Sequence, residues 1–298
     1  MGLHGGWGGA WWGMSLPAEV HELIRMALAE DVGPGDLTAR FFVPAEARLE
    51  AVILAKEPGV LAGVAVAEAV FRAVDPAISV TVRKQDGEVL AVREVVMELS
   101  GPAGSLLTAE RTALNFLQRL SGIASQTAVY VKAVAGTKAR ILDTRKTTPG
   151  WRWLEKAAVR AGGGTNHRTG LYDMAMVKDN HLPGAGGLEG LQAGIGALKA
   201  AYPDMKVELE ADTLEQVRGF LTLRGVSYIL LDNMTLEEMR ECVALAQGSG
   251  VELEASGGIT LERLPQIAAT GVDFISSGAL THSVKALDLS LEVSGTAF

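Results

Sequence analysis

The chain has a single cysteine, Cys242, among its 298 residues. One thiol cannot form an intramolecular disulfide, and it cannot build a cysteine-based zinc site. The letters around it, MRECVALAQ, are typical of a helix interior, so we expect a buried and inert thiol. A chain that does without disulfides fits a cytoplasmic setting.

Long apolar runs and an excess of positive charge are missing as well. No apolar run reaches the roughly 18 residues of a membrane span. The formal net charge of −8 argues against a broad nucleic-acid surface. Hydrophobic residues make up 48% of the chain and charged residues 21%, as in ordinary globular enzymes. We therefore expect neither a nucleic acid nor a membrane as partner.

The amino terminus lacks the features of a signal peptide. Residues 1–13, MGLHGGWGGAWWG, have neither a basic start nor a continuous apolar core. We expect a disordered extension there and leave it out of the reasoning on the fold. The remaining length is enough for two domains or one large barrel.

The first half of the chain mixes helix and strand patterns without regular alternation. Apolar positions recur at helical spacing in residues 17–31 and 62–74, while residues 49–55 have a strand pattern. The segments 79–84 and 89–99 flank Asp86-Gly87 as a hairpin would. A long helical stretch follows at 108–135, which Gly122 is expected to break. These patterns predict an open α/β sandwich, with a sheet covered by helices on one face.

The second half has a regular rhythm of short apolar runs that end in polar residues. Helical stretches lie between several of them, at 214–223, 236–246 and 261–269. This alternation predicts a parallel β/α barrel with its chemistry at the strand ends, and it leaves six, seven or eight strands open. The six runs are 141–143, 176–178, 207–210, 229–232, 251–256 and 274–278.

A basic cluster stands out in this acidic protein. Residues 143–181 contain seven Arg and Lys against four Asp and Glu, a net charge of +3. Such a cluster focuses small anions. We assign the charges of the presumed helix at 152–160 to a solvated helix face, because they are three to five residues apart. The candidates for an anion site are the charges at strand ends or beside glycines: Arg145, Lys146, His167, Arg168 and Lys178.

Each of these candidates also has a purely structural interpretation. Arg145 offers a planar fork that suits a carboxylate, but an ion pair with Asp143 or Glu110 would explain it equally well. The glycines at 162–164 let backbone amides approach an anion, and a helix end followed by a turn would also account for them. His167 could be a core histidine. Lys178 ends an apolar strand and therefore needs a carboxylate or a ligand as partner.

Acidic and small residues end the later strands. Glu210 and Asp232 end consecutive predicted strands and could share Mg²⁺, which prefers oxygen ligands and is often held jointly with substrate phosphates. Alternatively, both acids simply pair with the basic cluster. By strand parity Glu208 points the same way as Glu210, as a ligand or as a partner of Lys178. Phosphate is expected on the backbone amides that follow the last two strands, at Ser256, Gly257, Gly258, Ser277 and Gly278.

Six sequence motifs resemble those of the quinolinate phosphoribosyltransferases, also called carboxylating nicotinate-nucleotide pyrophosphorylases. The resemblance runs from about residue 16 to 290, in order, and implies an incomplete barrel of about seven strands. Expected domains are 14–125 for the sandwich and 126–285 for the barrel, with 286–298 returning to the first domain. The motifs are DTRKTTPG, AGGGTNHRTGLYD, KDNH, ILLDNM, EASGGI and ISSGALTHS.

The resemblance also implies an activity and its residues. Quinolinate and 5-phosphoribosyl 1-pyrophosphate would be converted to nicotinate mononucleotide, pyrophosphate and CO₂, with Mg²⁺ near Glu210 and Asp232. Lys146, Lys178 and these two acids would act in catalysis. Phosphoribosyl pyrophosphate would lie on Lys146, Ser256, Gly257, Gly258, Ser277 and Gly278. Quinolinate would be held by Thr144, Arg145, His167, Arg168, Lys178 and, from the neighbouring subunit of a homodimer, Arg111.

Two other functions remain open at this point. A nicotinate phosphoribosyltransferase, which acts on a monocarboxylate, would need fewer cations. A non-catalytic anion-binding or transport-associated relative would not need the acids Glu210 and Asp232. Trp151 departs from the smaller residue usual in the family, so packing near that turn is expected to differ. The resemblance also allows a larger assembly of dimers.

Overall fold

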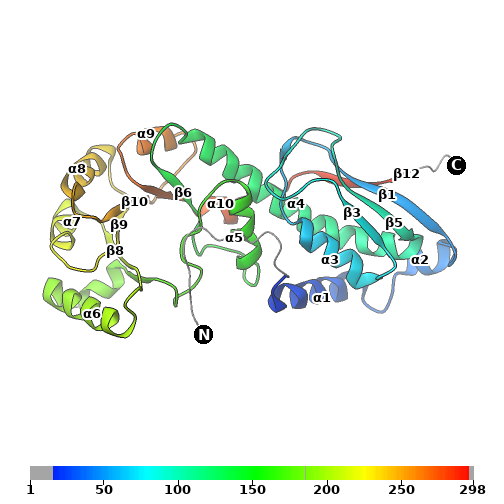
Figure 1. Ribbon diagram of the computed structural model, residues 1–298, viewed down its shortest axis with the longest axis horizontal. Coiled ribbons are helices and arrows are strands. Elements are labelled where there is room, and N and C mark those ends of the chain that lie inside the picture. Colours follow the sequence, from blue (N-terminus) through cyan, green and yellow to red (C-terminus); the bar gives the residue numbers. More distant parts are fainter. Residues whose placement is uncertain (1–15, 185, 295–298) are drawn as a thin grey trace. The chain divides into compact units, whose positions relative to one another are not determined.

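The computed structural model describes residues 16–184 and 186–294 of the chain (Figure 1). These residues form two compact units. Unit 1 contains the described parts of Met1–Ala128, Thr148–Gly163 and Ser283–Phe298, and unit 2 those of Val129–Thr147 and Gly164–His282. The expected extension at 1–13 and residues 295–298 of the expected final segment lie outside the described residues. No helix within the described ranges is both long and apolar enough to cross a membrane.

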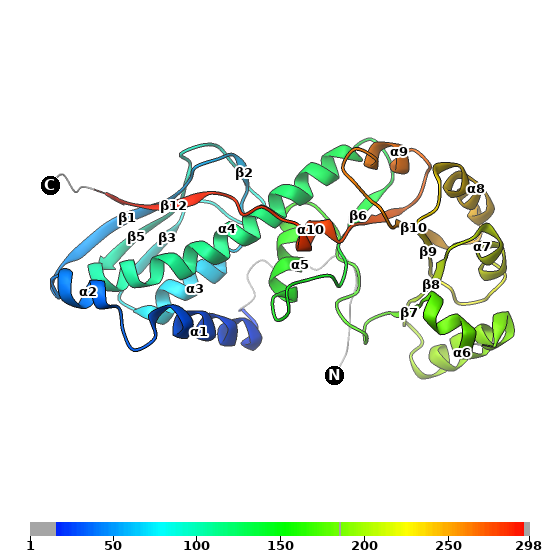
Figure 2. The same cartoon turned by 180° about the vertical axis from the view of Figure 1, so that it is seen from behind.

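Unit 1 is built on an antiparallel sheet of four strands. Their order is β12 (Leu289–Ser294), β1 (Arg48–Ala55), β5 (Val95–Pro102) and β3 (Ser79–Val82). The helices α1 (Ala18–Val32), α3 (Val64–Val74) and α4 (Ala103–Ala133) lie on one side of this sheet (Figure 2). Large side chains from both layers, among them Ile53, Phe71, Met97 and Phe116, are fully buried. The predicted sheet with helices on one face is confirmed.

The prediction of a hairpin around Asp86-Gly87 is confirmed only in part. The segments 79–84 and 89–99 do pair, since β3 and β5 are antiparallel neighbours. The connection between them is longer than a hairpin turn, however, because it contains β4 (Val89–Leu90), which pairs with β2 (Gly59–Val60). The Asp86 carboxylate accepts a hydrogen bond from the Val64 amide at 2.9 Å, at the start of α3. Burial raises the pKa of Asp86. Asp86 therefore caps a helix that is distant in the sequence, because its carboxylate accepts a hydrogen bond from one of the free amides at the start of that helix.

Gly122 does not break the long helix, because α4 runs without interruption from Ala103 to Ala133. A β-carbon at this position would collide with the carbonyl oxygen of Lys285 and lie 3.1 Å from Cα of Ala286. The glycine is needed for the close approach of the returning chain, which then adds β12 to the sheet. The Gln118 side chain secures this segment by donating a hydrogen bond to the Leu289 carbonyl oxygen at 2.7 Å.

The helix α5 (Arg152–Ala161) is not solvated on the face that we expected. Glu155 and Lys156 are 0% and 3% exposed. The Glu155 carboxylate accepts hydrogen bonds from the Thr148 amide at 3.2 Å and from the Thr148 hydroxyl at 2.8 Å, and it lies 3.4 Å from Arg119. Trp151 stacks on Phe116 with ring centroids 4.8 Å apart. Glu155 therefore holds the preceding turn, and Trp151 packs against α4.

Unit 2 contains a parallel sheet of six strands, and each of the six predicted runs forms one of them. Thr165 adds an isolated parallel bridge to Leu142, at the free edge of β6. The predicted α/β barrel class is confirmed, and the seventh strand position is reduced to this single bridge. The order is β6 (Arg140–Leu142), β11 (Phe274–Ser276), β10 (Glu252–Ser256), β9 (Tyr228–Asp232), β8 (Val207–Ala211) and β7 (Ala175–Val177).

Helices connect successive strands of unit 2. Capping boxes begin two of them, at Thr213 with Gln216 and at Thr235 with Glu238. A helix that starts immediately after a strand returns the chain to the amino edge of the sheet, so all carboxyl ends of the strands lie along one edge. The connecting helices are α6 (Gly187–Ala201), α7 (Leu214–Phe220), α8 (Leu236–Ala246) and α9 (Leu264–Ala268), with the short η1 (Asp179–Gly184) after β7 and α10 (Ala279–His282) after β11.

The replacement Gly122→Ala tests the tight passage beside α4. Alanine favours a helix over glycine by about 1 kcal/mol, but here the added methyl group overlaps the backbone of Lys285. We expect a net loss of about 1–3 kcal/mol, the usual cost of overpacking, measured by urea unfolding. Gly194→Ala in α6 is the matched control, because no atom lies within 4 Å of its added β-carbon. Equal stability of the two variants would contradict the role given to Gly122.

Candidate functional site

The predicted barrel residues gather along the carboxyl edge of the sheet in unit 2. Arg111 is the exception, since it lies on α4 in unit 1. The sheet topology brings together residues from every strand: Thr144, Arg145 and Lys146 follow β6, His167 and Arg168 follow the Thr165 bridge, Lys178 follows β7, Glu210 lies in β8, Asp232 and Ser256 end β9 and β10, Gly257 and Gly258 follow β10, and Ser277 and Gly278 follow β11.

Asp143 joins the end of β6 to the loop that carries His167 and Arg168. Its carboxylate is completely buried and accepts hydrogen bonds from the His167 amide at 2.8 Å and from the Asn166 side chain at 2.5 Å. Two such donors stabilise a buried carboxylate. They fix the loop of His167 to the end of β6.

The two arginines of the site carry like charges close together. Burial lowers the pKa of Arg168, and the neighbouring charge of Arg145 lowers it further. Among the residues that the structure describes, the Arg168 guanidinium donates long hydrogen bonds to the Met174 carbonyl oxygen at 3.3 Å and to the sulfur of Met176 at 3.4 Å. A buried cation with weak acceptors and a cation beside it is best compensated by an anion.

Lys178 has the carboxylate partner that its position required. Its Nζ lies 2.8 Å from Oε2 of Glu210. Burial raises the pKa of Asp232, and the charge of Glu210 adds to this effect. Two carboxylates that repel each other at the mouth of a sheet suit a shared divalent cation, and both offer the hard oxygen ligands that Mg²⁺ prefers. The donor set therefore fits the predicted metal ion.

The chain after β10 exposes its backbone rather than side chains. Gly257 and Gly258 have φ angles of 82° and 56°. A β-carbon on Gly257 would collide with the side-chain oxygen of Asn233. The backbone amide of Asn233 donates a hydrogen bond to the Ser256 carbonyl oxygen at 3.0 Å. Successive backbone amides in such a turn form a concave anion-binding surface. This local geometry is compatible with the predicted phosphate position.

Lys146 lies against the turn after β11. A β-carbon on Gly278 would lie 2.8 Å from Cδ of Lys146 and 3.0 Å from the His282 ring, so glycine leaves room for both side chains. The Thr281 hydroxyl donates to the Lys146 carbonyl oxygen at 2.7 Å, and the Ser277 amide donates to the Leu142 carbonyl oxygen. The loops after β6 and β11 are thus held together, with a lysine at their surface.

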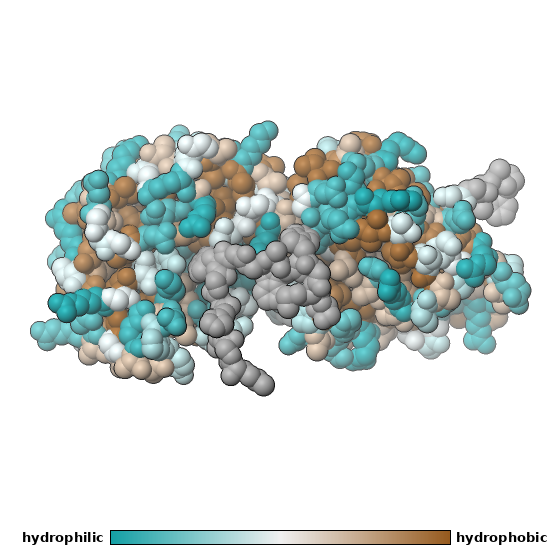
Figure 3. Space-filling model, in the orientation of Figure 1, coloured by the Kyte–Doolittle hydropathy of each residue, from teal (hydrophilic) through white to brown (hydrophobic). Residues whose placement is uncertain are grey.

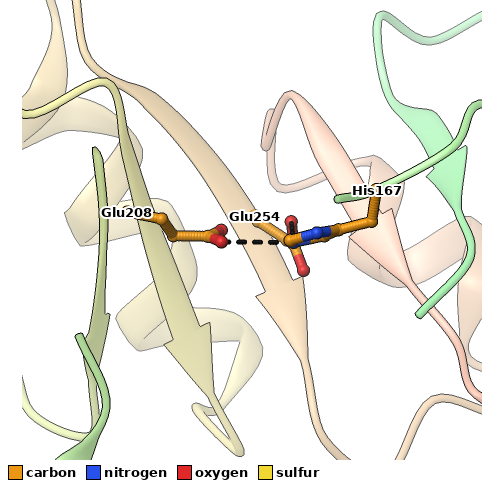
Figure 4. Close-up of side chains that lie close together, drawn as sticks. All are labelled: His167, Glu208 and Glu254. Atoms are coloured by element: carbon orange, nitrogen blue, oxygen red, sulfur yellow. Dashed lines mark ion pairs between the residues drawn. The ribbon is translucent and has the colours of Figure 1, made fainter. Parts of the chain in front are cut away.

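The ring of His167 points into the barrel, between β8 and β10 (Figure 4). Its Nε2 lies 3.1 Å from Glu208 and 3.2 Å from Glu254. The partner of Glu208 is therefore His167, and the alternative pairing with Lys178 is wrong. Glu254 is the first residue of the motif EASGGI, and we had expected no role for it. Its spacing of two from Ser256 places both side chains on the same face of the strand, which is a pattern that could have indicated it.

Arg111 does not lie near the beginning of its helix. The helical stretch expected at 108–135 would place Arg111 in its first turn, but α4 begins at Ala103, so Arg111 lies in the third turn. Arg111 is exposed, and among residues 16–184 and 186–294 no carboxylate pairs with it, Glu110 included.

A cavity of about 520 Å³ lies beside α6 and β7. Its walls are mainly apolar, with Met176, Val177, Leu191, Ile195 and Leu198 among them. Such walls do not match a small, highly charged ligand. The cluster of cations and acids at the strand ends is therefore the candidate active site.

Comparison with known proteins identifies the family. Residues 36–121 match the N-terminal domain of quinolinate phosphoribosyl transferase, and residues 123–292 match its C-terminal domain. The chain is 45% identical over 275 residues to a probable carboxylating nicotinate-nucleotide pyrophosphorylase of Bacillus subtilis, covering 92% of this chain and 93% of that protein. A chloroplastic carboxylating nicotinate-nucleotide pyrophosphorylase of Arabidopsis thaliana is 44% identical and covers 92% and 83%.

Solved structures agree with the sequence comparisons. The nicotinate-nucleotide pyrophosphorylase of Francisella tularensis superimposes with a TM-score of 0.87 at 38% sequence identity, covering 94% of this chain and 98% of that one. Both domains of the family are matched, and relatives above 40% identity span nearly the whole chain. The protein therefore belongs to the quinolinate phosphoribosyl transferase family.

Proposed function

We propose that this protein transfers the phosphoribosyl group of 5-phosphoribosyl 1-pyrophosphate to quinolinate and releases pyrophosphate and CO₂, leaving nicotinate mononucleotide, a precursor of NAD. The observation that carries the proposal is the group of cations around Arg145, Arg168 and Lys178 beside the acids Glu210 and Asp232, in a chain of this family. Cytoplasmic localisation is part of the proposal, and the single buried thiol of Cys242 is compatible with it.

The cation group fits a dicarboxylate better than a monocarboxylate. Arg145 and Arg168 repel each other, and one carboxylate can neutralise only one of them. The second carboxylate of quinolinate would compensate the other cation, with Thr144, His167 and Lys178 around the ring. Guanidinium groups bind carboxylates through paired hydrogen bonds, which also fixes the plane of the ring.

Phosphoribosyl pyrophosphate would be held by backbone groups and a lysine. The glycines after β10 and the turn of Ser277 and Gly278 supply amides for phosphate, and Lys146 adds a charge. Glu210 and Asp232 would hold Mg²⁺, which stabilises the departing pyrophosphate. Because Lys178 already shares Glu210, the lysine charge and the metal position would be coupled through one carboxylate.

The reaction needs no covalent nucleophile from the protein. Arg145 and Arg168 would align the pyridine nitrogen with the anomeric carbon of the sugar, and the carbon–oxygen bond to pyrophosphate breaks as the carbon–nitrogen bond forms. The ring nitrogen is then positively charged beside the 2-carboxylate. Loss of CO₂ leaves an electron pair on the 2-carbon that this nitrogen stabilises, and a proton is taken up at that carbon. The chain therefore contributes binding, orientation and exclusion of water.

A homodimer is the proposed active unit, with Arg111 reaching the site of the neighbouring subunit. The guanidinium of Arg111, which is exposed and has no carboxylate partner within the described part of the chain, supports this assignment. So does apolar surface near it: Leu37, Phe41 and Phe42 of α2 (Leu37–Phe42) are 68%, 68% and 82% exposed. Hydrophobic surface is visible on this unit in Figure 3, and exposed apolar patches mark interaction sites. Asp36, the cap of α2, accepts a hydrogen bond from Thr108, one turn before Arg111.

Incubation of the purified protein with quinolinate, phosphoribosyl pyrophosphate and Mg²⁺ tests the function directly. We expect nicotinate mononucleotide and one CO₂ for each pyrophosphate, and no turnover after the metal ion is removed with a chelator. Turnover of nicotinate instead of quinolinate, without CO₂, would assign the protein to the monocarboxylate reaction. Absence of turnover with either acid, together with intact anion binding, would indicate a non-catalytic relative.

Replacing Arg145 or Arg168 by alanine removes one of the two cations proposed for the carboxylates. Each variant should bind quinolinate about 10- to 100-fold more weakly, since hydrogen bonds to charged groups contribute roughly 1.5–3 kcal/mol. Isothermal titration calorimetry on the folded variants measures this affinity. Arg240→Ala is the control, because Arg240 is an exposed arginine of α8 that pairs with Glu237. Unchanged affinity in both site variants would remove these arginines from the carboxylate site.

Mixing two inactive variants tests the shared site. Arg111→Ala and Lys146→Ala should each be inactive as homodimers, whereas a hybrid dimer keeps one site with both residues. Random exchange makes about half of the dimers hybrids, so the mixture should recover about a quarter of the wild-type activity. In the control, Arg111→Ala protein is mixed with a double variant that carries both replacements, so that no dimer has an intact site. Hybrid dimers that form but stay inactive, or a monomer with full activity, would refute the proposal.

A further inference from the structure

Three ionisable side chains meet inside the barrel of unit 2, below the cations of its mouth. His167, Glu208 and Glu254 are 7%, 1% and 3% exposed. Figure 4 shows the imidazole between the two carboxylates, with Glu208 coming from β8 and Glu254 from β10. Ionisable groups are rarely buried to this extent without a function or a complete set of partners.

The hydrogen bonds of this cluster are incomplete. Oε2 of Glu208 lies 3.1 Å from Nε2 of His167 as an ion pair, but its geometry is not that of a hydrogen bond, and neither oxygen of Glu208 nor Oε1 of Glu254 has a hydrogen-bond partner among the described residues. Nε2 of His167 offers one N–H group to two carboxylates. A proton on one of the carboxyl groups would supply a second donor and remove one buried negative charge. Burial raises the pKa of Glu208 to about 7, the charge of Glu254 adds to this, and His167 opposes it.

The opposite side of the His167 ring is tied to Arg168. Nδ1 accepts a hydrogen bond from the Arg168 amide at 2.6 Å, and the His167 amide donates to Asp143. This use of the Nδ1 lone pair favours a neutral ring. Burial also lowers the pKa of His167, but Glu254 and Glu208 outweigh it and raise the pKa to about 10. The hydrogen bond to Nδ1 and the two carboxylates beside Nε2 both require a proton on Nε2.

We propose that Glu208 and Glu254 are positioning residues, which hold the Nε2–H group of His167 inside the barrel and thereby fix the backbone from which Arg168 reaches the substrate. The ring lies beside Glu208 of β8 and Glu254 of β10 and so ties this loop to both strands. The inference rests on the proposed function, because it assigns Arg168 to quinolinate. Neither glutamate touches the substrate in this account.

A divalent cation would be another way to satisfy the buried oxygens, since imidazole and carboxylate are ligands of Zn²⁺ and Mn²⁺. A metal ion would have to displace the Nε2 proton, which two carboxylates stabilise. The proposal therefore assigns a proton, and not a metal ion, to Nε2. Metal analysis of the purified protein separates the two cases: one tightly bound metal ion per chain that is lost in Glu254→Gln protein would overturn the proposal.

Replacing each glutamate by glutamine tests whether Glu208 and Glu254 hold the His167 ring; we call this arrangement the clamp. Glu254→Gln removes the charge that the Nε2–H group faces, and we expect KM for quinolinate to rise about 10- to 100-fold, with KM for phosphoribosyl pyrophosphate changed less than about threefold. Glu252→Gln on the same strand is the matched control, because Glu252 is half-exposed and lies 3.7 Å from Arg140. A Glu254→Gln protein with wild-type KM values would refute the positioning role.

Glu208→Gln tests the second carboxylate beside the His167 ring. It removes the charge that lies 3.1 Å from Nε2, and we expect KM for quinolinate to rise about 10-fold while KM for phosphoribosyl pyrophosphate changes less than about threefold. Wild-type KM values for both substrates would contradict the role given to Glu208.

A measurement on the unchanged protein covers the case that the glutamine variants do not fold. The chain has five histidines, so nitrogen-15 spectra can resolve their rings, and His167→Gln assigns the one in question. We expect an Nε2–H proton protected from exchange at pH 8, and its loss would refute the clamp. Wild-type protein that is inactive on quinolinate would reject the proposed function, whereas active protein without this protected proton rejects only the present inference.

Discussion

The buried carboxylate of Asp143 determines where the cations of the site lie. It directly follows β6 and accepts hydrogen bonds from the backbone of His167 and the side chain of Asn166. The glycines at 162–164 that precede this loop provide few side-chain contacts to order it. Arg145 and Arg168 repel each other, so attraction between them cannot bring them together. Hydrogen bonds to a charged acceptor supply the free energy that keeps these like charges close.

Much of the barrel could be predicted from sequence because two independent patterns agree. Short apolar runs that end in polar residues occur only where both faces of a parallel strand are covered, and all six of them became strands. Thr213 and Thr235 begin helices with capping boxes, which local sequence alone specifies. The requirement of Lys178 for a carboxylate partner followed from the cost of burying an unpaired ammonium, and Glu210 meets it.

The errors arose where distant segments decide the local structure. Asp86 caps a helix 22 residues earlier in the chain, and the connection between β3 and β5 is longer than the tight turn that its sequence pattern predicts. Gly122 is explained by the passing backbone of Lys285, which no window around the glycine contains. Glu155 has the spacing of a solvated helix residue, yet it is buried because Thr148 and Arg119 supply its partners. Tertiary partners override local propensity in all three cases.

Strand parity explains why the pairing of Glu208 could not be predicted. Glu208 and Glu210 project from the same face of β8, and parity cannot distinguish their depths. The structure does: Glu208 faces His167 within the barrel, whereas Glu210 faces Lys178 at the mouth. β10 repeats this arrangement with Glu254 below Ser256. Each of these strands thus contributes one residue to an acidic interior and one to the ligand-facing edge. A loop anchored in the interior can therefore hold its cation at the mouth without using the acids at the edge.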